Sequence, residues 1–113
     1  MNRSATSNEL TIASGEALSE PFSLRRYASI GVSVDAWTTA DLGLQACDTE
    51  DGTYKPVIAT DSNLVSISGF DQTSWYTLPA DLFPHRFIKL WSHSAGSDVN
   101  QDGDRTLKIS AKS

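Results

Sequence analysis

Cysteine is almost absent from this chain of 113 residues, because Cys47 is the single one. An intrachain disulfide is therefore excluded. Cys47 ends the alternating run 42–47. A lone cysteine at such a position is more often a small, partly buried apolar residue than a nucleophile.

Long hydrophobic runs are also missing. No stretch approaches the roughly 20 apolar residues that a membrane-spanning helix needs. The opening residues 1–9 lack the apolar segment of a secretory signal. We therefore expect a protein that does not associate with a membrane and that is made in a cytoplasm.

Positive charge is scarce, with 9 lysines and arginines against 14 aspartates and glutamates, a net charge of −5. The cations are scattered, whereas a general nucleic-acid-binding surface requires a basic stripe. We expect no nucleic-acid partner. The length suits one domain and is too short for two.

Helical periodicity is absent as well, and the apolar residues instead alternate with polar ones, as in half-buried strands. In the last segment Leu107, Ile109 and Ala111 share one face, and Lys108 lies on the other. We expect strands over residues 9–13, 17–24, 28–35, 42–47, 53–59, 64–68, 75–78, 86–93 and 105–112. The pattern predicts an all-β fold, a single antiparallel β-sandwich of about eight strands with jelly-roll or Greek-key connections.

The turn and loop residues between these segments refine the prediction. Residues 1–8 are polar and are expected to form a flexible arm, leaving residues 9–113 as the sandwich domain. Asp51-Gly52 indicates a hairpin turn, and Pro56 places the returning strand at a sheet edge or bulge. The proline-bounded segment 79–84 leaves room for only a single helical turn.

No set of residues suited to catalysis is apparent. The two histidines, His85 and His93, flank one predicted strand and would lie about 26 Å apart at ~3.3 Å per residue. They cannot share a metal ion or a proton within that strand, and no nucleophile motif accompanies either one. We therefore expect neither an enzyme nor a cofactor.

Asp98, Asn100 and Asp102, followed by Gly103, match the first half of a calcium-binding loop. The second half fails, because Ile109 stands where a bidentate glutamate is required. The other interpretation is a polar hairpin tip whose side chains bond their own backbone. No metal site is predicted, and the calcium loop remains the weaker alternative.

Aromatic residues suggest an interaction surface. Trp91 shares strand parity with Lys89 and His93, opposite to the apolar residues of that strand, and is the best candidate for exposure. Trp75 and Tyr76 are adjacent, so one of them must face outward in a strand. These five residues are the interface candidates, since exposed aromatic patches mark protein or glycan contacts.

Several short motifs follow one another in a distinctive order. They are residues 27–34, Ala36-Trp37 with Ala40, residues 42–46 with Asp51-Gly-Thr-Tyr54, Leu78-Pro79 with Phe83, residues 86–90 with Ser92, and Asn100-Gln101 with residues 105–107. In this order they resemble small proteins encoded among the structural genes of tailed bacteriophages and prophages, and the similarity covers roughly residues 24 to 112. The chain departs from that pattern at the inserted Thr49-Glu50 and at Cys47, where serine is more usual.

The resemblance implies a non-enzymatic virion protein, assembled in the cytoplasm of the bacterial host. A capsid decoration (cement) protein that binds between major capsid subunits is the first hypothesis, and neck or fibre components are alternatives within that class. The partners would be the major capsid protein or neck and tail proteins, and a homo-oligomer, preferably a trimer, is expected. The resemblance also implies that Asn100, Gln101 and Arg105 belong to a structural hairpin. A carbohydrate-binding module is the competing hypothesis, and a hydrolase on the same sandwich ranks last.

Overall fold

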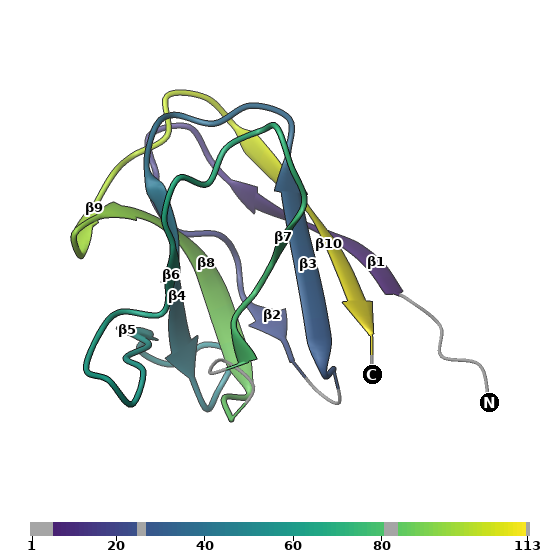
Figure 1. Ribbon diagram of the computed structural model, residues 1–113, viewed down its shortest axis with the longest axis vertical. Coiled ribbons are helices and arrows are strands. Elements are labelled where there is room, and N and C mark those ends of the chain that lie inside the picture. The colour runs from purple at the N-terminus through teal and green to yellow at the C-terminus, as the bar shows by residue number, and fades with distance from the viewer. Residues whose placement is uncertain (1–5, 25–26, 81–83, 113) are drawn as a thin grey trace.

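The computed structural model describes residues 6–24, 27–80 and 84–112, and in these residues the chain forms two antiparallel sheets packed face to face (Figure 1). The strands are β1 (Thr6–Ile12), β2 (Phe22–Ser23), β3 (Ser29–Val34), β4 (Asp41–Cys47), β5 (Lys55–Pro56), β6 (Ser66–Ile67), β7 (Tyr76–Thr77), β8 (Phe87–Ser94), β9 (Ser97–Asp98) and β10 (Arg105–Lys112). Within the described ranges, no helix is long and apolar enough to cross a membrane. The predicted all-β sandwich is confirmed.

The order of the strands is that of a jelly roll. Sheet A has the order β1-β10-β3-β7, and sheet B has the order β2-β8-β4-β5, with β6 paired to β4 and β9 paired to β8. The pairing is nested, because β1 pairs with β10, β2 with β8, β3 with β7 and β4 with β5, always antiparallel. A chain that folds back on itself as one long hairpin and then rolls up gives this order.

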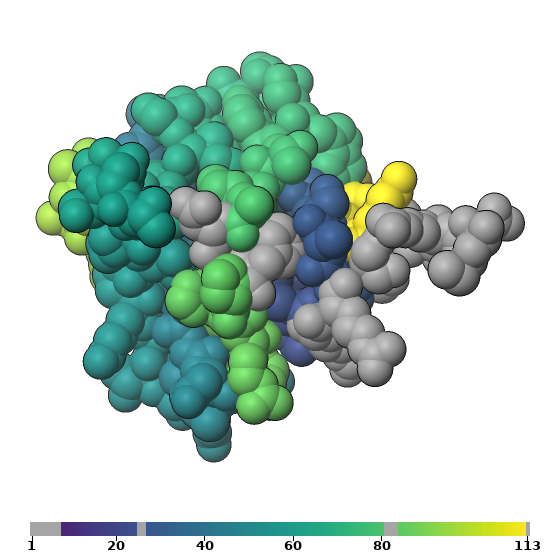
Figure 2. All heavy atoms as spheres, turned by 60° about the horizontal axis from the view of Figure 1, so that its bottom comes forward, coloured from purple at the N-terminus to yellow at the C-terminus, as the bar shows by residue number. Residues whose placement is uncertain are grey.

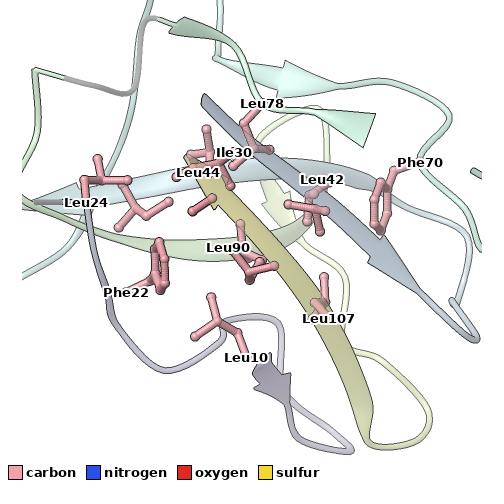
Figure 3. Packing of buried hydrophobic residues seen from close by; sticks show 14 of the residues in the cluster. Leu10, Phe22, Leu24, Ile30, Leu42, Leu44, Phe70, Leu78, Leu90 and Leu107 are labelled. Atoms are coloured by element: carbon pink, nitrogen blue, oxygen red, sulfur yellow. The ribbon is translucent and has the colours of Figure 1, made fainter. Parts of the chain in front are cut away.

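The core lies between the two sheets and is filled by the inward-facing residues of both (Figure 3). Leu107 and Ile109 of β10, Leu44 of β4 and Leu90 of β8 are each at most 2% exposed. Their strand neighbours face outward, so the alternation predicted from the sequence holds in the long strands.

The short strands differ from the prediction. Residues 17–24 contribute only the two residues of β2 and a single bridge from Leu18 to Trp91. β9 was not predicted at all. It forms a hairpin with β8 through Ala95 and Gly96, whose φ angles of 50° and 86° give the twist that suits a two-residue turn. Alanine is uncommon in that conformation, so the sequence carries little signal for the turn.

The expected N-terminal arm is wrong for residues 6–8. These residues begin β1 and pair with residues 109–111 of β10. Residues 1–5 lie outside the described residues. The free edge of β1 is partly covered, because the Thr11 amide donates to Glu20 and the Glu9 amide to the Asn8 side chain. Such covering protects an edge strand from pairing with another chain.

The reversal between β4 and β5 occurs where Asp51-Gly52 predicts it, and Pro56 lies on the edge strand β5 as expected. Gly52, however, is not among the described glycines with a positive φ. A side chain at Gly52 would collide with the Cys47 sulfur and the Thr49 hydroxyl, so close approach explains the glycine. The helical turn predicted over 79–84 falls mainly on residues 81–83, outside the described residues.

Candidate functional site

Trp91 and His93, two of the five interface candidates, are buried. Each is only 2% exposed, and their rings stack at a centroid distance of 4.4 Å. The prediction that Trp91 is exposed is therefore wrong. Trp91 does lie on the outer face of sheet B, as its parity predicts, but that part of the face is covered.

Gly43 and the β8–β9 hairpin explain the burial. Gly43 of β4 lies opposite Trp91 in the register. A Cβ atom at Gly43 would lie 2.6 Å from the His93 ring and 2.9 Å from the Trp91 ring, so only glycine lets both rings lie against the sheet. Asp98 of β9 then accepts a 2.7 Å hydrogen bond from the indole nitrogen of Trp91.

The hydrogen bonds of His93 define its protonation state. The Gly96 amide donates to Nδ1 at 3.1 Å, so Nδ1 carries no proton, and Nε2 donates to the Ser66 hydroxyl at 2.9 Å. Burial lowers the pKa of His93 below its usual value, although Asp41 and Asp98 act in the opposite direction. The ring is a neutral structural group whose nitrogens are both engaged.

The loop proposed for calcium is held by hydrogen bonds within the protein. Asp98 binds Trp91, and Asp102 accepts from Thr38 and forms an ion pair with Arg105. Asn100 is exposed. Among residues 6–24, 27–80 and 84–112, no group of three or more histidine, cysteine, aspartate or glutamate side chains could hold a metal ion.

Gln101 is the central residue of this end of the molecule. It is 1% exposed, and its amide group makes four hydrogen bonds, with the Thr38 amide and carbonyl, the Arg105 guanidinium and the Ser92 hydroxyl. Its backbone also bonds Gly15 and Glu16. Gln101 and Arg105 are part of one structural loop, as the resemblance implies, and Arg105 donates to the side chains of Gln101, Thr38 and Asp102. Composition alone gives no sign that this glutamine is buried.

Trp75 lies on the outer face of sheet A and is 59% exposed. It is the more exposed of the two large hydrophobic residues that reach solvent in the described ranges. Its neighbour Tyr76 turns inward, packs against Phe70 at 4.9 Å and bonds Asp71. One residue of the adjacent pair faces outward, as predicted. Trp75 borders a shallow groove of about 410 Å³, here called the Trp75 groove, whose lining residues are Ser29, Gly31, Trp75, Thr77, Ser110 and Lys112.

Lys89, the last interface candidate, is half-buried on the outer face of sheet B. Its ammonium group lies 4.6 Å from the centre of the Tyr54 ring, a favourable contact for a cation. Burial, with Cys47, Glu50 and Asp51 adding to it, raises the pKa of Tyr54 above its usual value. The phenol therefore stays neutral beside Lys89.

A second exposed surface, which is not among the predicted interface residues, lies around Ile58, which is 55% exposed. It borders a groove of about 490 Å³, here called the Ile58 groove, lined by Ala46, Cys47, Asp48, Lys55, Pro56, Val57, Ile58, Pro84, His85 and Arg86. In Figure 2 the blue-green β4–β5 region and the light green segment from Pro84 gather on the face turned to the viewer. The sequence does contain a signal for this exposure, because Val57 and Ile58 are adjacent apolar residues that cannot both face inward in a strand.

The two histidines are separated as the spacing predicts. His85 lines the Ile58 groove, and His93 lies in the buried cluster near the other end of β8. The five interface candidates therefore do not form one site. Trp75 remains an exposed aromatic, Lys89 and Tyr76 are half-buried, and Trp91 and His93 are part of the interior.

Comparison with protein-family models finds no match, and comparison with curated proteins finds none either. Among solved structures, the chain is similar to the crystal structure of SPBc2 prophage-derived protein YomS, with a TM-score of 0.61 and 17% sequence identity. The similarity covers 100% of this chain and 98% of that chain. At this identity the likeness shows a common fold, extending over both chains nearly end to end.

Proposed function

We propose that this protein is a non-catalytic structural component of a tailed bacteriophage virion, and that it decorates the capsid by binding between major capsid subunits. The fold it shares with a prophage-derived protein supports the phage assignment, together with the motifs that resemble phage structural proteins. Because one fold serves many functions, the proposal depends on a surface suited to a protein partner.

The Ile58 groove is the observation that carries the proposal. Ile58 is an exposed β-branched residue that borders the same groove as Pro56 and Pro84, so apolar surface is concentrated there. Lys55 and Arg86 border the same groove. An apolar centre with a charged rim is the usual composition of a protein interface.

The charges indicate what the partner supplies. Lys55 and Arg86 outnumber Asp48, the one acidic residue among the described residues that line the groove, in a chain whose net charge is −5. An apolar segment flanked by carboxylates on a capsid subunit would complement this surface. As a decoration protein at a symmetry axis the chain would act as a homo-oligomer, and a trimer is our proposal.

The first experiment measures where the protein is and how much of it is present. Particles purified from the encoding phage or induced prophage should contain the chain in an amount comparable with the major capsid protein. A neck or fibre protein would be present at a small fraction of that amount. Absence from purified particles would refute the virion assignment.

The second experiment tests the surface. Particles made without the gene should bind added full-length protein, and Ile58→Asp should abolish co-sedimentation by placing a charge in the apolar contact. Trp75→Ala is the matched control, because it removes a similarly exposed apolar residue from a different surface of the protein. Undiminished binding of Ile58→Asp would show that the partner docks elsewhere.

The competing carbohydrate hypothesis loses Trp91 as a stacking residue, since that ring is buried. Among the residues that the structure describes, Trp75 is the exposed aromatic that this hypothesis can still use.

A further inference from the structure

The Trp75 groove combines an indole with groups that form hydrogen bonds. Trp75 is 59% exposed, and its ring lies near Gly31. A Cβ atom at Gly31 would lie 3.6 Å from the Trp75 ring. The other lining side chains are the hydroxyls of Ser29, Thr77 and Ser110 and the ammonium of Lys112. Trp75 is thus the one large apolar side chain among the described residues that line this groove, which distinguishes it from the Ile58 groove.

The register of sheet A fixes the spacing of these groups. Gly31 pairs with Ser110 on one side and with Thr77 on the other, so the three residues form one row across β10, β3 and β7. Strands lie about 4.8 Å apart, so the two hydroxyl-bearing residues are separated by roughly 10 Å with glycine between them. In the next row Lys112 pairs with Ser29. Because Gly31 has no side chain, the backbone at this position forms the bottom of the Trp75 groove.

We propose that the Trp75 groove binds a saccharide, with a pyranose ring against the indole and an acidic group of the sugar facing Lys112. A pyranose has an apolar C–H face that suits an aromatic ring, and its hydroxyls both donate and accept hydrogen bonds. Serine and threonine hydroxyls can do the same, so they match the sugar in either direction. The volume of about 410 Å³ is in the range of small-ligand sites.

Charge decides between neutral and acidic sugars. Among the described residues that line the groove, Lys112 is the single charged one, in a protein of net charge −5. A cation beside hydrogen-bonding hydroxyls complements a carboxylate, as in a uronic or sialic acid. This inference is independent of the proposed capsid contact, because it uses different residues on the other sheet.

The test is binding of the full-length protein to acidic glycans and to their methyl esters, which keep the pyranose and remove the charge. We expect the acidic forms to bind, the esters to bind more weakly, and added salt to reduce the difference. Trp75→Ala should weaken binding by about tenfold or more, and Trp75→Tyr should restore part of it. Lys112→Ala should remove the preference for the acid over the ester, and Lys112→Arg should keep it.

Ile58→Ala is the matched control and should leave glycan binding unchanged, since Ile58 lies outside the groove. Circular dichroism of each variant separates loss of the site from loss of the fold. Failure of every glycan to bind would overturn the proposal, and so would binding that Trp75→Ala does not weaken. Equal binding of acid and ester would overturn the assignment of Lys112. Loss of particle binding in Ile58→Asp, with glycan binding intact, would separate the two functions.

Discussion

The imidazole of His93 is held neutral by its surroundings. Nδ1 accepts the Gly96 amide, so a proton added there would break that hydrogen bond, and burial disfavours the charged ring. Asp41 and Asp98 oppose this effect without reversing it. A single buried residue therefore makes stability depend on pH.

We expect the free energy of unfolding to fall as the pH is lowered from about 6.5, the usual pKa of histidine. The lowered pKa means that the unfolded chain takes up the His93 proton before the folded chain does. The stabilisation is fully present above the unfolded pKa and is lost as the pH falls through the folded pKa. Urea unfolding between about pH 7.5 and pH 5 would measure this.

His93→Asn keeps an acceptor near the position of Nδ1 and cannot titrate, so its stability should change less over the same range. Nuclear magnetic resonance titration of the native protein gives the His93 pKa directly. A value above that of an unstructured histidine would contradict the argument.

At the scale of elements, β4 and β8 fit together because one strand lacks a side chain where the other carries two rings. Gly43→Ala would place a methyl group against His93 and Trp91. We expect a loss of about 1–3 kcal/mol in the free energy of unfolding, the usual cost of overpacking. Chemical denaturation would measure it.

Gly31→Ala is the control, since its methyl group would make an ordinary contact at 3.6 Å with the Trp75 ring. It should change stability by no more than about 0.5 kcal/mol. Equal effects of the two substitutions would show that a side chain at Gly43 is tolerated as well as one at Gly31.

At the scale of the whole molecule, the nested pairing gives the C-terminal strand an interior place. β10 lies between β1 and β3 in sheet A and contributes Leu107 and Ile109 to the core. A chain ending at residue 104 should therefore fail to fold, although terminal residues are often dispensable. Circular dichroism and amide dispersion in nuclear magnetic resonance spectra would report the loss.

A peptide of residues 105–113 supplied in trans should restore part of the folded signal, because the gap between β1 and β3 is specific in register. A folded truncated chain without the peptide would show that sheet A closes by another pairing.

The local sequence was sufficient for the long strands and for much of the core. Residues 105–112, 29–34 and 42–47 alternate clearly, and alternation is a property of the extended backbone itself. The exposure of one residue in the Trp75-Tyr76 pair followed from the same rule. The short extent of the two-residue strands could not be predicted, and β9 lies outside every predicted strand, because so few residues show no period and their pairing depends on distant segments.

The sequence by itself determined which side of a long strand each residue occupies, since successive side chains point to opposite faces wherever the strand lies. Only the tertiary structure decided which outward-facing residues reach solvent. Trp91 and His93 are covered because Gly43 of a neighbouring strand makes room for them and the β8–β9 hairpin bonds them. Trp75, on the outer face of sheet A, is not covered in this way by the residues that the structure describes and is 59% exposed. The physical reason is that burial depends on contacts between residues far apart in the chain.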